Sequence, residues 1–170
     1  MRLYLLRHAD AVPRGTPGYR QDAQRPLTEA GHVQAREVAE GLKRLKVPVD
    51  AIGVSVLLRA AQTAEYVARA FGLEQALRQL DTLRPEAEPA DTSQALRAFS
   101  RCEHVVLVGH EPHLSTWLGW LVAEQGQVRC LFKKAGVACV EIERAPPAKG
   151  SGTLRWFMTP KQLALIGKIA

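Results

Sequence analysis

The chain has 170 residues, of which 46% are apolar and 24% are charged. This composition is typical of one folded domain with its own hydrophobic core, and it is unlike that of a disordered chain. The 23 Lys and Arg residues outnumber the 17 Asp and Glu residues, so the formal net charge is +6, which favours phosphate-bearing partners in general. The basic residues are scattered and aromatic residues make up only 6%, so we expect no nucleic-acid interface.

The sequence contains no apolar stretch that approaches the roughly 18 residues of a membrane-spanning helix, and its first residues do not resemble a signal peptide. We therefore expect a cytoplasmic protein that does not bind membranes, and the composition favours a monomer. Its three cysteines, Cys102, Cys130 and Cys139, are an odd number whose spacing suits neither a disulfide framework nor a zinc site. We expect them to be free thiols.

Short apolar runs that are typical of strands alternate along the chain with segments of helical periodicity. The expected strands are 2–8, 51–55, 77–83 and 104–110, followed by an antiparallel pair, 137–143 and 153–158, at the sheet edge. A loop over 13–26 follows the first strand. The expected helices run from an N-cap at Thr28 to a stop at Pro48, from residue 57 to Gly72 with Ser55 as its cap, over 91–101, and onward from Pro112.

This alternation of strands and helices predicts one domain, residues 1–170, with an α/β/α sandwich around a mostly parallel sheet. A ligand crevice is expected beyond the carboxyl ends of the parallel strands. Only about 20 residues separate Leu83 from His104, which is too few for a large helical lid over that crevice. We therefore expect an open pocket.

Polar side chains lie at or just after the ends of three expected strands. Arg7 and His8 end the first strand, His110 ends the run 104–110, and Arg59 lies about one helical turn after the strand 51–55. Because the carboxyl ends of parallel strands meet at one edge of a sheet, these side chains are expected to converge.

Arg59 is unusual on structural grounds alone, because a cation in the first turns of a helix faces the positive end of the helix dipole. A phosphoryl group bound there would resolve the conflict, since helix amino termini and guanidinium groups both favour anions. Thr63, one turn further along, shares the same face of the helix. This pattern predicts a phosphate site at the start of the helix.

His8 would lie among cations, which make its protonation costlier and lower its pKa below the usual value of about 6.5. A neutral imidazole can attack phosphorus, while Arg7 and Arg59 balance the charge on the phosphoryl oxygens and His110 donates a proton or a hydrogen bond. Water would then hydrolyse the phosphohistidine intermediate on the enzyme.

Four sequence blocks together resemble the histidine phosphatase superfamily. They are Leu5-Leu6-Arg7-His8-Ala9-Asp10, Arg25-Pro26-Leu27-Thr28-Glu29-Ala30-Gly31, Val54-Ser55-Val56-Leu57-Leu58-Arg59-Ala60-Ala61-Gln62-Thr63-Ala64 and Val108-Gly109-His110-Glu111-Pro112. The first block resembles the Arg-His-Gly signature that this superfamily carries near its amino terminus. In order, and over nearly the whole chain, the four blocks are similar to the SixA-like branch of small phosphohistidine phosphatases.

The resemblance implies a phosphoglycerate mutase-like fold without a large lid insertion, and it implies that His8 is the phosphorylated nucleophile. Arg7, Arg59 and His110 would complete the phosphate pocket, and Arg25 would join them as a residue of the shared second block. No metal and no cofactor are implied, and the sequence itself contains no H-E-x-x-H motif or carboxylate cluster.

Two positions depart from the family pattern. The third signature position is Ala9 instead of Gly, which adds one methyl group. Related mutases and phosphomonoesterases carry a Glu as proton donor after the third strand, where this chain has Thr82. Asp81 or Glu86 would replace it, or no strong acid is needed, because an imidazole leaving group can be protonated beforehand.

The missing acid favours cleavage of an N–P bond, and an open basic pocket suits a phosphohistidine presented by another protein, such as a phosphotransfer or phosphocarrier domain. The sequence leaves three alternatives: a broad phosphomonoesterase on small metabolites, a non-catalytic domain that binds phosphoproteins, and a nucleic-acid binder that uses the +6 charge. Outside the proposed site, His32 and His104 are expected to be ordinary surface or capping residues. His113 lies one turn into the helix after His110; it is expected to be exposed without a function, and the alternative is that it borders the pocket.

Overall fold

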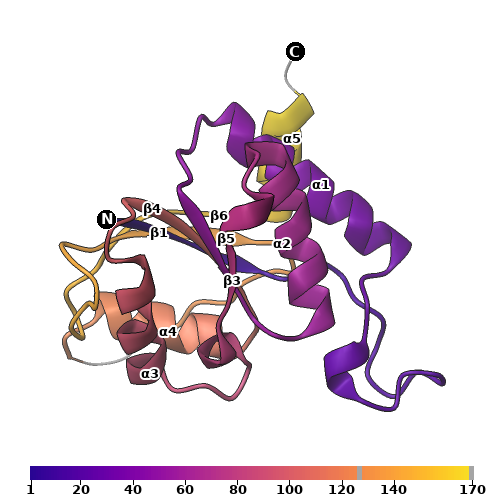
Figure 1. Ribbon diagram of the computed structural model, residues 1–170, viewed down its shortest axis with the longest axis horizontal. Coiled ribbons are helices and arrows are strands. Elements are labelled where there is room, and N and C mark those ends of the chain that lie inside the picture. Colours follow the sequence, from indigo (N-terminus) through magenta and orange to yellow (C-terminus); the bar gives the residue numbers. More distant parts are fainter. Residues whose placement is uncertain (126–127, 169–170) are drawn as a thin grey trace.

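The computed structural model describes residues 1–125 and 128–168. Its strands form one sheet (Figure 1), in the order β3-β2-β4-β1-β5-β6. The strands are β1 (Arg2–Arg7), β2 (Ala51–Val54), β3 (Leu77–Gln79), β4 (His104–Gly109), β5 (Val137–Glu141) and β6 (Thr153–Met158). The first four pair in parallel, whereas β5 and β6 form an antiparallel pair at one edge. The predicted α/β architecture with a closing antiparallel pair is confirmed.

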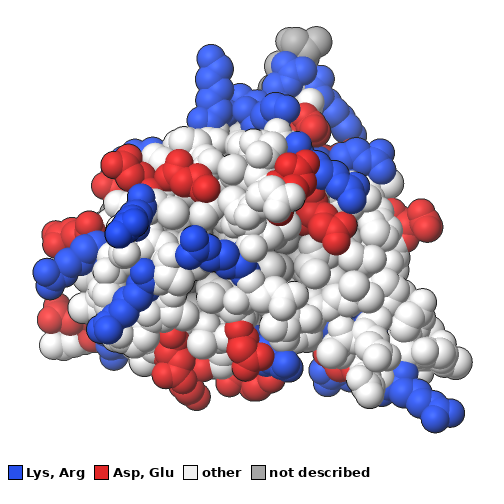
Figure 2. Space-filling model, viewed as in Figure 1, with Lys and Arg blue, Asp and Glu red and all other residues white. Residues whose placement is uncertain are grey.

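Helices cover both faces of the sheet (Figure 1). One face carries α1 (Glu29–Arg44), α2 (Leu58–Phe71) and α5 (Pro160–Lys168), and the other carries α3 (Pro89–Ala95) and α4 (His113–Val122). Short 3-10 helices, η1 (Asp22–Gln24), η2 (Glu74–Ala76), η3 (Asp81–Leu83) and η4 (Leu96–Phe99), lie in the connections. None of the helices in the described part of the chain is both long and apolar enough to cross a membrane. On the face of the molecule shown in Figure 2, Lys and Arg side chains are interspersed with Asp and Glu side chains.

The central strand β1 supplies side chains to two hydrophobic cores, one on each face of the sheet. Tyr4 and Leu6 pack in the core formed with α1 and α2, while Leu3 and Leu5 pack in the core formed with α3 and α4. This alternation follows from the two-residue period of a strand. Because all four side chains are buried, β1 is a continuous apolar run in the sequence. Its register is well defined, since a shift of one residue would move each of these side chains to the opposite core.

The helix boundaries confirm some of the predicted signals and correct others. Thr28 is the N-cap of α1, where its Oγ1 accepts from the backbone N–H of Gly31 at 3.0 Å. Gly72 ends α2 with φ of +68°, a left-handed conformation that suits glycine. The prediction that Pro48 stops α1 is wrong, since the helix ends at Arg44 and Lys46 turns the chain with φ of +53°. Ser55 does not cap α2, because Leu57 occupies the N-cap position.

Two connections also differ from the predicted elements. The third strand ends at Gln79 and continues as η3, instead of reaching residue 83. The segment expected as one helix over 91–101 begins at Pro89 and divides into α3 and η4. This compact connection between β3 and β4 contains no large lid.

The carboxyl-terminal helix α5 was not predicted. It packs against α1, and Gly41 allows the close approach, because a Cβ at that position would overlap the backbone carbonyl of Leu163. Leu163 is the one fully buried side chain that α5 contributes to the core. A nine-residue helix with so narrow an apolar face gives little periodic signal in the sequence.

Candidate active site

Three strand ends meet at one edge of the sheet, as predicted. In the parallel pairing of β1 with β4, Arg7 lies opposite Gly109, so His8 and His110 follow at the same level. The backbone N–H of His8 donates to Gly109 O at 3.0 Å, and the two imidazole ring centroids are 4.9 Å apart. On the other side of β4, the backbone N–H of Ser55 donates to Val108 O at 3.0 Å, which brings the end of β2 to the same place.

His8 is held as a neutral imidazole with a defined tautomer. Its Nδ1 lies 2.7 Å from the carbonyl oxygen of Ala9, and because a carbonyl only accepts, Nδ1 carries the hydrogen and Nε2 carries the lone pair. The Nε–H of Arg59 donates to this Nε2 at 3.3 Å. Burial and the nearby cations Arg59, Arg7 and Lys134 lower the pKa of His8 to about 3. Cations do keep His8 neutral, as predicted, but burial has the larger effect.

His110 lies beside His8 and is 1% exposed. Its Nε2 is 2.9 Å from Ser55 Oγ, whereas its Nδ1 is buried and has no hydrogen-bond partner among the described residues. Burial, together with the neighbouring His8 and Arg59, lowers the pKa of His110 to about 2. Both imidazoles are therefore neutral at physiological pH.

The Arg59 side chain is 3% exposed and is fixed by a carboxylate that sequence reasoning missed. Its Nη2 lies 3.0 Å from Asp22 Oδ2, and its Nη1 donates to the backbone oxygen of Asp22 at 2.9 Å. Arg25 Nη2 and Arg14 Nε lie 2.8 Å and 3.1 Å from Asp22 Oδ1. Burial opposes ionisation of Asp22, but the hydrogen bonds and charges of these arginines outweigh it and hold its pKa well below the usual range.

A signal for Asp22 was present in the sequence, because it is the single acidic residue in the segment 11–28, which also contains Arg14, Arg20 and Arg25. A lone carboxylate among several arginines is a candidate partner for any further buried cation.

Arg7 is held from the opposite side of the pocket. Its Nη1 donates to Phe132 O at 2.6 Å, while its Nε is buried without a partner among the described residues. The backbone N–H of Phe132 in turn donates to Glu111 Oε1 at 2.7 Å. Glu111 therefore fixes the loop that orients Arg7.

A cavity of about 580 Å³ brings together every residue that was predicted to bind or attack phosphate. Its lining includes the predicted residues Arg7, His8, Arg25, Arg59 and His110. Lys134, which the sequence analysis did not identify, also lines the cavity and forms an ion pair with Asp10. Thr63 supports the floor, because its Oγ1 accepts from the backbone N–H of Ala9 at 3.1 Å.

The two carboxylates considered as proton donors, Asp81 and Glu86, do not line this cavity. The side chain of Asp81 is 75% exposed and pairs with Arg84, and Glu86 is also exposed. The carboxylates that do line the cavity are Asp10 and Glu111. Across residues 1–125 and 128–168, no three His, Cys, Asp or Glu side chains gather in a group that could hold a metal ion.

The prediction for His113 is wrong, because its side chain is buried, 1% exposed, instead of lying at the surface. Its Nε2 is 2.9 Å from Thr92 Oγ1 and its Nδ1 is 2.9 Å from Ala87 O. Both ring nitrogens are therefore satisfied, and His113 connects α4 to α3 instead of facing the cavity. His32 pairs with Tyr66, as expected of a structural residue.

Comparison with known proteins assigns the chain to the same family that its sequence blocks resemble. Residues 3–85 match the model of the histidine phosphatase superfamily (branch 1). The chain is 31% identical to phosphohistidine phosphatase SixA of Escherichia coli (strain K12), over 97% of this chain and 98% of that protein. It also superposes on the structure of the protein histidine phosphatase SixA complexed with tungstate, with a TM-score of 0.82, 28% identity, and coverage of 96% of this chain and 99% of that one.

The two matches to SixA proteins extend over almost the full length of those proteins. They include both the strand ends that carry the paired histidines and the antiparallel edge of the sheet. The chain therefore belongs to the histidine phosphatase superfamily, in its SixA-like branch.

Proposed function

We propose that this protein is a phosphohistidine phosphatase that hydrolyses the N–P bond of phosphohistidine on other proteins, with His8 as nucleophile. The observation that carries this proposal is the geometry of His8, whose Nδ1 hydrogen is held by Ala9 O so that the Nε2 lone pair faces the Arg59 guanidinium. The full-length similarity to phosphohistidine phosphatase SixA supports the same substrate class, and the tungstate complex of a similar SixA supports an oxyanion site.

In the first step, the lone pair on His8 Nε2 forms a bond to phosphorus as the P–N bond of the substrate breaks. The electron pair of that bond goes to the departing imidazole nitrogen, and a proton already on the other ring nitrogen lets the group leave as neutral imidazole. Arg7 and Arg59 balance the charge on the phosphoryl oxygens, and His110 donates a hydrogen bond to one of them. Water then attacks the phosphohistidine on the enzyme, releasing phosphate and restoring His8.

The carboxylates near the pocket favour N–P substrates over esters. Burial opposes ionisation of Asp10, but a hydrogen bond from Lys134, which has the largest effect, and one from Thr28 lower its pKa. Glu111 accepts hydrogen bonds from the backbone of Phe132 and from Ser115 Oγ. Both groups are held as acceptors, so neither is placed to protonate an alkoxide leaving group.

The partner that we propose is a phosphohistidine-bearing protein, such as a phosphotransfer or phosphocarrier domain. The absence of a large lid in the compact connection between β3 and β4 supports access for a protein surface. The pocket rim carries Lys134 and Arg14, whose side chains are 45% and 80% exposed. We further propose that residues 1–170 act as a single domain; the monomeric state and the cytoplasmic location stay predictions from the sequence.

The test compares phosphate release from a phosphohistidine protein, a phosphoserine peptide and sugar phosphates. We expect the phosphohistidine protein to be turned over fastest, and His8→Ala to abolish turnover. His32→Ala is the matched control, because His32 contacts Tyr66 away from the cavity and its loss should leave the rate unchanged. Faster turnover of sugar phosphates would favour the alternative of a broad phosphomonoesterase, and undiminished activity of His8→Ala would overturn the proposal.

A further inference from the structure

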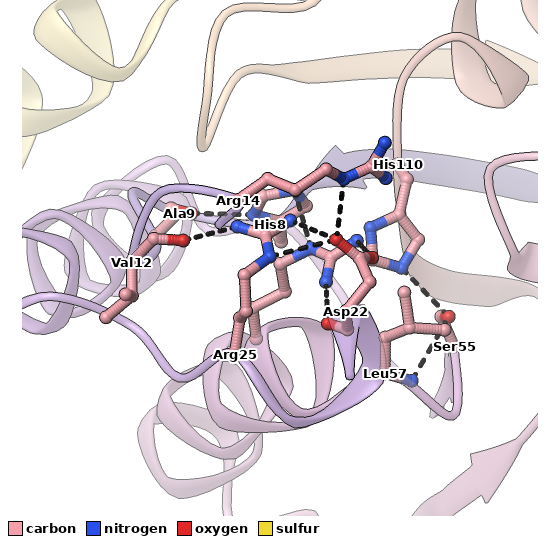
Figure 3. A network of polar contacts seen from close by, with 10 residues as sticks. His8, Ala9, Val12, Arg14, Asp22, Arg25, Ser55, Leu57 and His110 are labelled. Carbon is pink, nitrogen blue, oxygen red and sulfur yellow. Dashed lines mark hydrogen bonds and ion pairs between the residues drawn. The ribbon is translucent and has the colours of Figure 1, made fainter. Parts of the chain in front are cut away.

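Ser55 makes a buried contact with the second histidine of the site. Its side chain is 0% exposed, and its Oγ lies 2.9 Å from His110 Nε2 at the carboxyl end of β2 (Figure 3). On its other side, Ser55 Oγ accepts from the backbone N–H of Leu57 at 3.4 Å, in the turn that leads into α2. These are the two hydrogen-bond partners of Oγ within the described residues.

A neutral imidazole carries one hydrogen, so its partner decides which ring nitrogen can donate. For His8 the partner is a carbonyl oxygen, which only accepts, and the hydrogen must lie on Nδ1. For His110 the partner is a hydroxyl group, which can accept or donate. The tautomer of His110 therefore depends on whether the Ser55 hydroxyl donates its hydrogen to His110 Nε2 or accepts a hydrogen from it.

The hydrogen-bond count around Ser55 favours one tautomer. If His110 Nε2 carried the hydrogen, Ser55 Oγ would accept from both Nε2 and Leu57, and its own hydrogen would have no acceptor among the described residues. A buried hydroxyl hydrogen without an acceptor is costly. If Nε2 instead accepts from Ser55, every group around this hydroxyl is satisfied, and the hydrogen of His110 lies on Nδ1.

The remaining group is then His110 Nδ1–H, which is buried and has no partner among the described residues. The ring that carries it lies 4.9 Å from the His8 ring, centroid to centroid. Because His110 and His8 line the same cavity and His110 Nε2 is already bonded to Ser55, Nδ1–H is the His110 group that can bind a phosphoryl oxygen while the lone pair of His8 Nε2 attacks phosphorus. With the opposite tautomer, His110 would present a lone pair to the phosphoryl oxygens and repel them.

We propose that Ser55 is a positioning residue that fixes His110 in the Nδ1–H tautomer, so that His110 presents a hydrogen-bond donor to the transferring phosphoryl group. This inference rests on the proposed function, because it assigns His110 to that reaction. Ser55 does not line the cavity that contains His8 and His110, so it acts only through its contact with His110. The two histidines thus share one tautomer but use it for opposite roles: one offers a lone pair and the other offers a hydrogen.

The experiment combines Ser55→Ala with a matched control, Ser93→Ala. Ser93 is also buried, at 1% exposed, but its hydroxyl bonds to Pro89 O and to Trp117 Nε1, away from the cavity. The ¹⁵N NMR shifts of the histidine rings in the free enzyme report which nitrogen carries hydrogen. Steady-state kinetics with a phosphohistidine protein report kcat and KM.

In the wild-type protein we expect His110 to be protonated at Nδ1 and unprotonated at Nε2, and we expect Ser55→Ala to shift it toward the other tautomer. Loss of one correctly oriented donor to the transition state should lower kcat about 10- to 100-fold, with KM changed less than about threefold. Ser93→Ala should change neither the ring shifts nor kcat.

The proposal is overturned if wild-type His110 carries its hydrogen on Nε2, if Ser55→Ala leaves the tautomer unchanged, or if the tautomer shifts without any loss of kcat. The NMR result does not depend on turnover. If the wild-type protein does not hydrolyse phosphohistidine, the proposed function fails, while the ring shifts still report whether Ser55 sets the tautomer.

Discussion

Lowering the pH from 7.5 to 5 should destabilise this protein by about 4 kcal/mol through His8 and His110 alone. Burial lowers the pKa of His8 to about 3 and that of His110 to about 2, whereas both groups titrate near 6.5 in the unfolded chain. At pH values between about 6.5 and 3, the unfolded state therefore binds protons at these two histidines and the folded state does not. This contribution to stability is fully present above pH 6.5 and is lost as the pH falls toward 3.

The size of the effect follows from proton linkage. At pH 5 an unfolded-state histidine with a pKa of about 6.5 is almost fully protonated, which favours unfolding by about 2 kcal/mol for each histidine that stays neutral in the folded state. Urea unfolding at pH 7.5 and pH 5 measures the difference. Phosphate-free buffers are required, because an oxyanion that binds the folded site would add its own stabilisation.

The matched comparison is the double variant His8→Gln/His110→Gln, which removes both titrating groups. Between pH 7.5 and pH 5, the free energy of unfolding of this variant should fall by about 4 kcal/mol less than that of the wild type. Burial also lowers the pKa of His113, but His113 is present in both proteins and cancels in the comparison. If the two proteins show the same pH dependence within about 1 kcal/mol, the site histidines are not held neutral and the reasoning is refuted.

Substitutions at three further positions test the fold and the site. Gly31→Ala should destabilise the protein by about 2 kcal/mol or more, because the added Cβ would overlap the backbone carbonyl of Asp10; an unchanged urea midpoint would contradict this. Thr28→Ala should cost about 1 kcal/mol by removing the N-cap bond of α1, and Thr28→Ser should restore it in the same assay. Asp22→Ala should lower kcat on a phosphohistidine protein about tenfold or more by releasing Arg59; an unaltered kcat would show that Asp22 does not position the guanidinium.

The parts of the fold that were predictable carry their signal in local patterns. The apolar run 104–110 is buried on both faces, as a central parallel strand must be, and Thr28 and Gly72 mark helix ends through their own side-chain or backbone chemistry. α5 was missed because its stability comes from close packing on α1 at Gly41, which is a contact between distant parts of the chain. No sequence window contains that information.

The candidate site also contains residues that local sequence patterns predict and residues whose roles depend on contacts between distant parts of the chain. Arg7, His8, Arg59 and His110 were predictable because they lie at strand ends or within about one helical turn after them, and the topology brings strand ends together. The roles of Asp22 and Ser55 were not predictable in this way. Asp22 is defined by an ion pair with Arg59, 37 positions along the chain, and Ser55 is defined by its contact with His110, 55 positions away. Ser55 was interpreted as a helix cap because its local sequence fits that role equally well.

The pairing of β1 with β4 at the centre of the sheet has a consequence for how the site comes apart. Amide hydrogens in these two strands should be among the last to exchange with solvent, so His8 and His110, which directly follow the strands, should keep their places until the molecule unfolds globally. Asp22 belongs to a segment outside the sheet, so a smaller, local opening can separate it from Arg59. A local opening of this segment therefore disturbs the contact that holds Arg59 before it disturbs the strands that lead into His8 and His110.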